Sequence, residues 1–246
     1  MNTLSREMTV GELAATQPAS VRVFEAHQID FCCGGKTPLD EACRTRGIDT
    51  DALLREIGAA AAGVPEEKDW TSAQAPDLID HIVGAHHAYL KTELPRLESM
   101  LAKIRSKHAA RHGAVLDPLA ETFGSLKEEL ESHLMKEERI LFPMIRLLAE
   151  ERQSGSEPAE FHCGSVKNPL RVMFLEHDSA GAALERMRSL TKDYTPPEDA
   201  CATFRAFYWG LAELERDLHR HIHLENNILF PKAVALEGGS TSAYAK

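Results

Sequence analysis

One motif occurs twice in this chain and constrains its fold more than any other feature. Each copy has a histidine, a glutamate four residues later, and then Ile-Leu-Phe-Pro; the pairs are His133 with Glu137 and His221 with Glu225. A spacing of four places both members of a pair on one face of an α-helix, one turn apart. The first stripe continues with apolar residues, namely Ile140, Leu141 and Met144. We therefore expect both pairs to point into a helical interior.

A single histidine precedes each copy at a matching distance. His87 lies 46 residues before His133, and His177 lies 44 residues before His221. Both single histidines fall on apolar helical stripes. Each half of the chain thus supplies a His and then a His-x3-Glu pair, so four helices should bring six ligand-type side chains to one level.

The rest of the pattern predicts an all-α fold. Four long amphipathic stretches are joined by connections rich in Gly and Pro, one of which covers 109–118. Long helices with modest connections predict an up-down-up-down four-helix bundle. The expected helices cover residues 77–108, 119–152, 170–192 and 198–236.

A small helical unit precedes the expected bundle. Short amphipathic runs at 10–15, 20–27 and 49–61 predict helices, although the unit is too short to carry much of a core alone. The stretch before the bundle carries Pro, Gly and charge without helical periodicity. The predicted divisions are an N-terminal domain at 1–66, a linker at 67–76, the bundle at 77–237 and a flexible tail at 238–246.

The repeated pattern is better explained by metal binding than by packing. A lone His-x3-Glu pair is usually a solvated surface pair, and a lone core histidine is usually hydrogen-bonded packing. Two inward pairs, each with its own preceding histidine, would bury several unpaired groups at high cost. We interpret six residues as metal ligands: His87, His133, Glu137, His177, His221 and Glu225.

The donor types limit the choice of metal. Imidazole and carboxylate without thiolate suit iron or manganese, and ligands from all four helices are typical of di-metal carboxylate proteins. If Glu137 and Glu225 both bridge, positions remain open for an oxo bridge, water or a diatomic molecule. The sequence therefore predicts a reactive or releasable di-metal centre.

Other residues near the motif have candidate supporting roles. Glu129 and Asp217 each lie one turn before a motif histidine, and Glu176 adjoins His177, where a carboxylate can orient imidazole. His108 would lie about 31 Å from His87 along a continuous helix, too far to share its site. The remaining histidines are interpreted as surface or supporting residues: His81, His86, His112, His162, His219 and His223.

Composition limits the partners and the compartment. The net charge is −10, without a dense basic stripe, which disfavours nucleic acid and anionic membranes. We find no signal peptide pattern and no apolar run long enough to span a membrane. Five cysteines in no framework spacing favour reduced thiols and a cytoplasmic location. Cys32 and Cys33 are adjacent, so a disulfide between them would be strained, and Gly34-Gly35 leaves the backbone open to a close approach.

Together these motifs resemble the RIC (repair of iron centres) family of the ScdA/YtfE type. The resemblance lies in Ile29-Asp-Phe-Cys-Cys-Gly-Gly-Lys36, in Glu67-Lys-Asp-Trp70 and in the doubled His-x3-Glu-x2-Ile-Leu-Phe-Pro motif. It implies a cytoplasmic, often dimeric protein with a hemerythrin-like bundle and two non-haem iron ions, oxo- and carboxylate-bridged. It places the iron ligands on the same six residues.

The resemblance implies repair of iron-sulfur clusters after nitrosative and oxidative stress, by supplying iron to damaged or apo iron-sulfur proteins. Two alternatives stay open at this point. One is a nitric oxide reductase that couples two NO molecules to N2O, with electrons arriving through Cys32 and Cys33. The other is an oxygen or iron sensor. The adjacent thiols are expected to receive nitric oxide, handle electrons or pass iron to a client.

Overall fold

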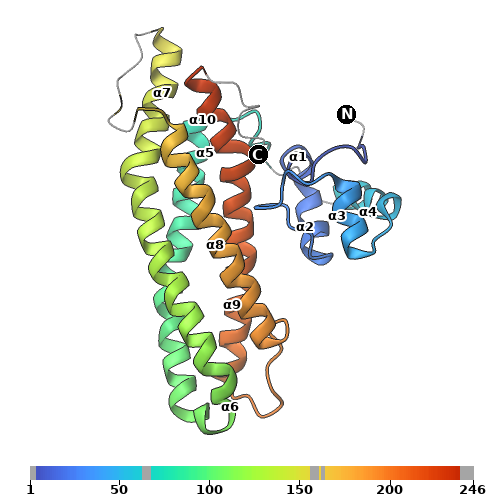
Figure 1. The fold of residues 1–246 in the computed structure, drawn as a ribbon, viewed down its shortest axis with the longest axis vertical. Helices are drawn as coiled ribbons and strands as arrows, with labels where there is room; N and C mark the ends of the chain where they lie inside the picture. The colour runs from blue at the N-terminus through green and yellow to red at the C-terminus, as the bar shows by residue number, and fades with distance from the viewer. Residues whose placement is uncertain (1–3, 63–67, 156–160, 162–163, 239–246) are drawn as a thin grey trace. The chain divides into compact units, whose positions relative to one another are not determined.

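The computed structural model describes residues 4–62, 68–155, 161 and 164–238. Several sequence predictions lie outside these residues: those for His162, residues 63–67 and nearly all of the tail. The described residues form helices and turns and include no strand, which confirms the predicted all-α class (Figure 1). Among the described helices, none is both long enough and apolar enough to cross a membrane.

The chain divides into two compact units. The first comprises Met1–Asp80, Met144–Leu170 and His219–Lys246, and the second comprises His81–Pro143 and Arg171–Leu218. The helices of the N-terminal segment belong to the first unit and are α1 (Val10–Thr16), α2 (Ala19–Ala26), α3 (Leu39–Arg46) and α4 (Thr50–Ala62).

The N-terminal helices differ from the sequence expectation in two ways. Helix α3 was not predicted, because it is short and buries only Leu39 and Cys43. Its acidic first turn, basic last turn and left-handed Gly47 after the last residue nevertheless stabilise it. The expectation of little core was also wrong, since eleven buried residues pack together here: Val10, Leu13, Ala14, Val23, Phe24, Ile29, Phe31, Leu39, Cys43, Leu53 and Ile57.

The long helical stretches are present but are interrupted by π-helical segments. Three such segments, η1 (Ile82–His87), η2 (Glu137–Leu141) and η3 (Glu225–Leu229), lie between α-helices without a break in the helical backbone. The α-helices are α5 (Ala75–His81), α6 (Ala88–Lys136), α7 (Phe142–Ser154), α8 (Lys167–Thr191), α9 (Ala202–Leu224) and α10 (Phe230–Leu236).

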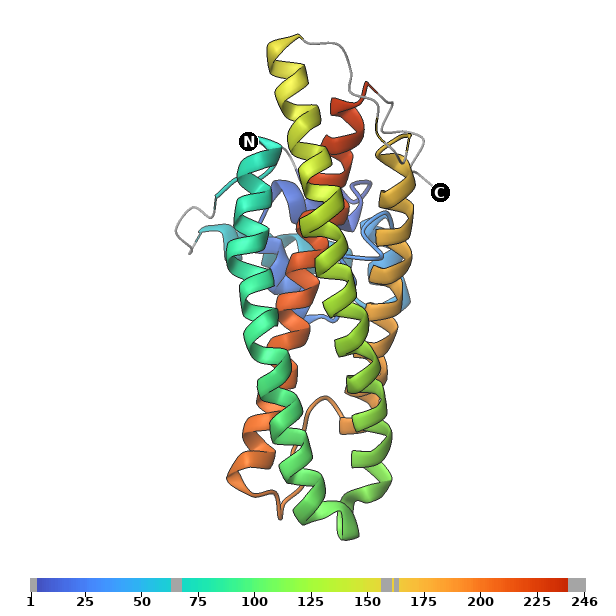
Figure 2. The same cartoon turned by 90° about the vertical axis from the view of Figure 1, so that its left-hand side faces the viewer.

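Helix α6 reverses direction, although its residues remain helical throughout. Lys127 Nζ lies 3.0 Å from Glu98 Oε2, whereas a straight helix would separate residues 29 apart by about 44 Å. Arg105 and Asp117 pair at 2.8 Å closer to the bend. Figure 2 shows the two antiparallel limbs. The predicted non-helical loop at 109–118 is therefore wrong, because the chain turns back with local helical geometry.

The two limbs of α6, together with α8 and α9, form a bundle with a continuous apolar core in the second unit. Leucines dominate the core along α6, and Phe204, Phe207 and Tyr208 of α9 supply its aromatic part. Phe123 packs edge-on against Phe207, with ring centroids 6.4 Å apart. This packing fixes the rotation of each helix about its axis, and thereby fixes which polar residues face inward.

Candidate metal centre

All three π-helical segments coincide with predicted ligands. Segment η1 ends at His87, η2 begins at Glu137, and η3 begins at Glu225. A π-helical turn inserts an extra residue into the helix and is frequently found at functional sites. Sequence periodicity could not predict these π-helical segments, because it assumes a uniform 3.6-residue repeat.

The two copies of the motif differ in which residues are buried. Ile140 was expected to continue the buried stripe, but it is 57% exposed, whereas Leu141 and Met144 are 1% and 5% exposed. In the second copy, the corresponding Ile228 is only 5% exposed, although it lies at the same position of a π-helical segment. The π-helical turn therefore does not by itself decide the exposure of this position.

Four of the six predicted ligands come together in the second unit. His87, His133, Glu137 and His177 are all buried. Oε2 of Glu137 lies 3.4 Å from Nε2 of His87 and 3.4 Å from Nε2 of His133. Nε2 of His177 lies 3.2 Å from Nε2 of His133. Three imidazoles from three helical segments thus gather around one carboxylate.

The other two predicted ligands lie one turn apart at the junction of α9 and η3. Nε2 of His221 is 3.0 Å from Oε1 of Glu225, and both side chains are buried. In this second copy, the four-residue spacing therefore places the histidine beside the glutamate, as the sequence predicted.

Within each unit, the ligand atoms lie close enough together to hold a cation. In the second unit, ligand atoms of His133, Glu137 and His177 all lie within 4.8 Å of one another, and so do those of His87 and Glu137. In the first unit, ligand atoms of His221 and Glu225 lie within the same distance. Imidazole and carboxylate are the donor types of di-metal carboxylate proteins.

The environment of Glu137 tests whether a cation fits this arrangement. Neither of its carboxylate oxygens has a hydrogen-bond partner, and the side chain is fully buried. Burying an ionised carboxylate without hydrogen bonds is costly unless a charge of opposite sign or a metal compensates. Nitrogen and oxygen donors without thiolate suit iron. The residues therefore fit a buried metal centre.

Carboxylates on the outer side of two imidazoles set the orientation of their rings. Nδ1 of His87 lies 2.8 Å from Oε1 of Glu138, and Nδ1 of His133 lies 2.8 Å from Oε2 of Glu176. An ionised carboxylate can only accept, so each Nδ1 carries a proton. In the neutral form of these rings Nε2 then keeps its lone pair, which is the form that binds a cation.

Each of these carboxylates is itself held by a lysine. Lys91 contacts Glu138, and Lys136 contacts Glu176. Burial opposes ionisation of both carboxyl groups, but the hydrogen bonds from the lysine and the histidine outweigh it, so the pKa of each is lowered. Glu176 was predicted as a supporting residue, but the imidazole that it contacts is that of His133, not that of its sequence neighbour His177.

Two other predicted supporting carboxylates have different partners. Glu129 is exposed and accepts a hydrogen bond from Ser179 at 2.9 Å, while its role beside the imidazole of His133 stays a prediction. Asp217 pairs with Nδ1 of His86 at 2.9 Å. His86 was interpreted as a surface or supporting residue, and it is 8% exposed, so it is buried and not on the surface. One helical turn of separation did not show which neighbouring helix each carboxylate faces.

His108 lies with a different group of side chains. Its ring is 5.4 Å from that of Phe204 and 6.3 Å from that of His112. His112 in turn pairs with Asp199 at 3.0 Å. The ligand groups found among the described residues do not include His108.

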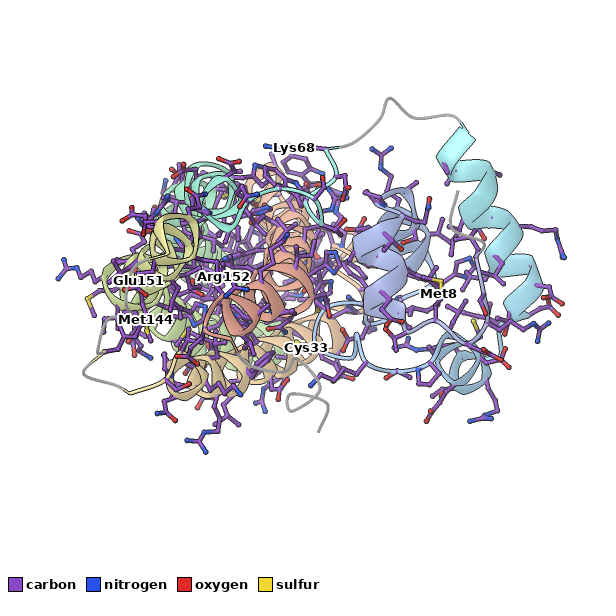
Figure 3. All side chains as sticks on the ribbon, turned by 90° about the horizontal axis from the view of Figure 1, so that it is seen from above. Met8, Cys33, Lys68, Met144, Glu151 and Arg152 are labelled. Carbon is purple, nitrogen blue, oxygen red and sulfur yellow. The ribbon has the colours of Figure 1, made fainter. Side chains whose placement is uncertain are left out.

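The adjacent cysteines lie in the loop between α2 and α3 (Figure 3). Both are free thiols, with sulfur atoms 3.9 Å apart. The carboxylate of Asp30 organises this loop by accepting hydrogen bonds from the backbone N–H groups of Cys32, Cys33 and Gly34. The hydrogen bond to Cys33, together with burial and the nearby Asp30, raises the pKa of Cys32 well above its usual value.

Sequence reasoning missed several residues of this region. Asp30 could have been found as an Asp two residues before a turn, where its side chain commonly caps backbone N–H groups. Glu138 directly follows a ligand and contacts the imidazole of His87, on a different helical segment. His223 is buried, and burial lowers its pKa to about 4. No local pattern distinguished it from a surface histidine.

Comparison with known proteins agrees with this geometry. Residues 78–233 match the Hemerythrin HHE cation binding domain, and residues 6–61 match ScdA_N, a domain of unknown function. The iron-sulfur cluster repair protein YtfE of Cronobacter sakazakii is 43% identical over 94% of this chain and 98% of its own length. The protein of the same name from Escherichia coli O81 is 41% identical over 94% of this chain and 99% of its own. The chain therefore belongs to the family of YtfE-type iron-sulfur cluster repair proteins, with a hemerythrin-like four-helix bundle that follows a small helical N-terminal domain.

Proposed function

We propose that this chain is a di-iron protein that repairs iron-sulfur clusters damaged by nitrosative and oxidative stress, by supplying iron. The observation that carries the proposal is the buried Glu137, whose two oxygens have no hydrogen-bond partner and which lies 3.4 Å from the imidazoles of His87 and His133. The names of the relatives support the repair function, and the hemerythrin match supports the metal.

The six predicted ligands would hold two iron ions. His87, His133, Glu137 and His177 belong to the second unit, and His221 and Glu225 to the first. Bound iron would supply a redox-active cation that binds a small ligand or is passed to a client. The protein contributes lone pairs fixed by Glu138 and Glu176, and a buried setting that limits access of water.

In this proposal, the loop that carries Cys32 and Cys33 contacts the client protein. Cys33 is partly exposed and Cys32 lies beside it, so a damaged or apo iron-sulfur protein could contact this pair. The proposal also includes a cytoplasmic homodimer with nitric oxide or oxygen as a small ligand. The boundaries predicted from the sequence, 1–66, 67–76 and 77–237, remain part of it. The family resemblance supports these points.

Repair is preferred to nitric oxide reduction. Both functions would use the same ligands, so the ligand geometry does not separate them. The relatives that cover nearly the whole chain carry the name of repair proteins. No observation in the described residues specifically favours a reductase.

Iron transfer to an apo-cluster protein tests the proposal. Protein loaded with iron-57 is mixed with an apo iron-sulfur protein, sulfide and a thiol reductant, and labelled iron in the separated client is measured. The wild type should deliver label, whereas Glu225→Ala should bind less iron and deliver less. His108→Ala is the matched control and should behave as wild type. Iron that is retained in the presence of the client, or full loading of Glu225→Ala, would contradict the proposal.

A further inference from the structure

The two copies of the motif differ immediately after their glutamates. The first copy continues with Glu138 and Arg139, and the second with Asn226 and Asn227. Arg139 is exposed. In contrast, Nδ2 of Asn227 donates to the carbonyl oxygen of Phe31 at 3.0 Å, and Nδ2 of Asn226 donates to that of Cys32 at 3.3 Å. The second copy therefore holds the loop that carries the adjacent cysteines.

Asn227 occupies a slot that only glycines allow. A Cβ atom added to Gly11 or to Gly35 would lie 2.5 Å from Oδ1 of Asn227, closer than such contacts occur. The N–H of Gly11 donates to the carbonyl oxygen of Gly35 at 2.7 Å, which joins the two walls of the slot. The second glycine of the Cys-Cys-Gly-Gly sequence is therefore explained by the approach of Asn227.

Further contacts surround this slot. Nδ2 of Asn227 also lies 2.9 Å from Nδ1 of the buried His223, whose ring meets that of Phe31 edge-on at 5.6 Å. Arg220 makes two hydrogen bonds of 2.9 Å with Glu25 of α2. Polar, aromatic and ionic contacts thus converge on about two turns at the junction of α9 and η3, which also carry His221 and Glu225.

We propose that Asn227 is a positioning residue: it docks the Cys32–Cys33 loop on the helical segment that carries His221 and Glu225, and docking restrains the reactivity of Cys32. The proposal rests on the proposed function only in giving the thiols a role. Cys32 is 5% exposed in the docked loop, so a reagent or client reaches its sulfur only when the loop opens. Because Glu225 and Asn227 share one π-helical segment, a cation on Glu225 should also fix the turn that holds the loop.

Alkylation of single cysteines measures this docking without reference to repair activity. Full-length protein, either metal-free or loaded with iron, is treated with iodoacetamide under anaerobic conditions without added thiol. Modification of Cys32 is then quantified by peptide mass spectrometry. Asn227→Ala removes the hydrogen bonds, and Gly35→Ala fills the slot from the other side. Each change should raise the alkylation rate of Cys32 by roughly tenfold, since one or two hydrogen bonds are lost from the closed state.

Two controls match these variants. Arg139→Ala changes the corresponding position of the first motif copy, and Gly58→Ala adds a Cβ where no atom lies within 4 Å. Both should alkylate at the wild-type rate, and circular dichroism should show unchanged helix content in all variants. In the wild type, iron should slow alkylation of Cys32, and Asn227→Ala should reduce this effect.

The outcomes separate the positioning proposal from the repair proposal. A wild-type alkylation rate in both Asn227→Ala and Gly35→Ala would overturn the positioning role, whatever the repair activity. If Asn227→Ala loses helix content, the comparison of Gly35→Ala with Gly58→Ala decides. If alkylation follows the expectation while the wild type transfers no iron, the positioning role stands and the repair proposal fails.

Discussion

Replacing Glu137 by Gln should stabilise the metal-free protein and remove most of its stabilisation by iron. Both oxygens of the buried Glu137 lack hydrogen-bond partners. Oε2 lies 3.4 Å from Nε2 of His87 and 3.4 Å from Nε2 of His133, and in the neutral rings that bind a cation these nitrogens present lone pairs. A carboxylate faced by lone pairs is unfavourable, whereas the N–H groups of a Gln amide could donate to them.

The size of the effect follows from the burial of this side chain. An unsatisfied buried polar group costs about 1–3 kcal/mol, and more if it is charged. The Gln variant should therefore raise the free energy of unfolding of the metal-free protein by about 2 kcal/mol, equivalent to about 4–8 °C in Tm for a chain of this size. Iron at a concentration of about a hundred times its Kd should raise the free energy of unfolding of the wild type by about 2.7 kcal/mol, and that of the variant only slightly.

Thermal and urea unfolding, followed by circular dichroism with and without ferrous iron under anaerobic conditions, measure both quantities. Glu129→Gln is the matched control, because Glu129 is exposed and contacts only Ser179 among the described pairs. It should change the free energy of unfolding by less than about 0.5 kcal/mol in either state. A metal-free Glu137→Gln protein that is less stable than the wild type would refute the reasoning, since Glu137 would then have a structural partner.

Three further outcomes are expected. Arg188→Ala should lower the free energy of unfolding by about 3 kcal/mol in urea without changing iron content, because it leaves the 4% exposed Glu215 without its bidentate partner; a loss below about 1 kcal/mol would contradict this. Leu141→Ala should lower the free energy of unfolding by about 3 kcal/mol, and Ile140→Ser by less than about 0.5 kcal/mol, because Leu141 is buried and Ile140 is exposed at η2. Equal losses would contradict this difference in burial. The raised pKa of Cys32 predicts that its alkylation rate climbs with pH through a midpoint above that of a free cysteine, and an ordinary midpoint would contradict the docked loop.

The second motif copy explains why the two halves of the chain are alike in ligands but not in surroundings. Glu137 and Glu225 occupy the same place in the repeat, yet the next residue is Glu138 in one copy and Asn226 in the other. Glu138 contacts an imidazole, whereas Asn226 contacts the cysteine loop. A repeated ligand pattern can therefore serve one metal centre while its neighbours take on separate tasks.

The sequence by itself predicted the helical class, the long helical stretches, and ligand-type residues that do lie together within each unit: His87, His133, Glu137 and His177 in one, and His221 and Glu225 in the other. It could do so because helical periodicity is local: a spacing of four puts His133 beside Glu137 whatever the rest of the chain does. The doubled motif then made burial without a cation implausible on energetic grounds.

Only the tertiary structure decided the details that depend on neighbouring helices. Periodicity could not reveal that Ile140 is exposed while Ile228 is buried, nor that Glu176 contacts His133 while Glu129 contacts Ser179. It also could not show that Asn227 fills the space beside Gly35. These contacts join residues far apart in the chain, and their geometry is set by how the helices rotate and pack against one another, which no local pattern encodes.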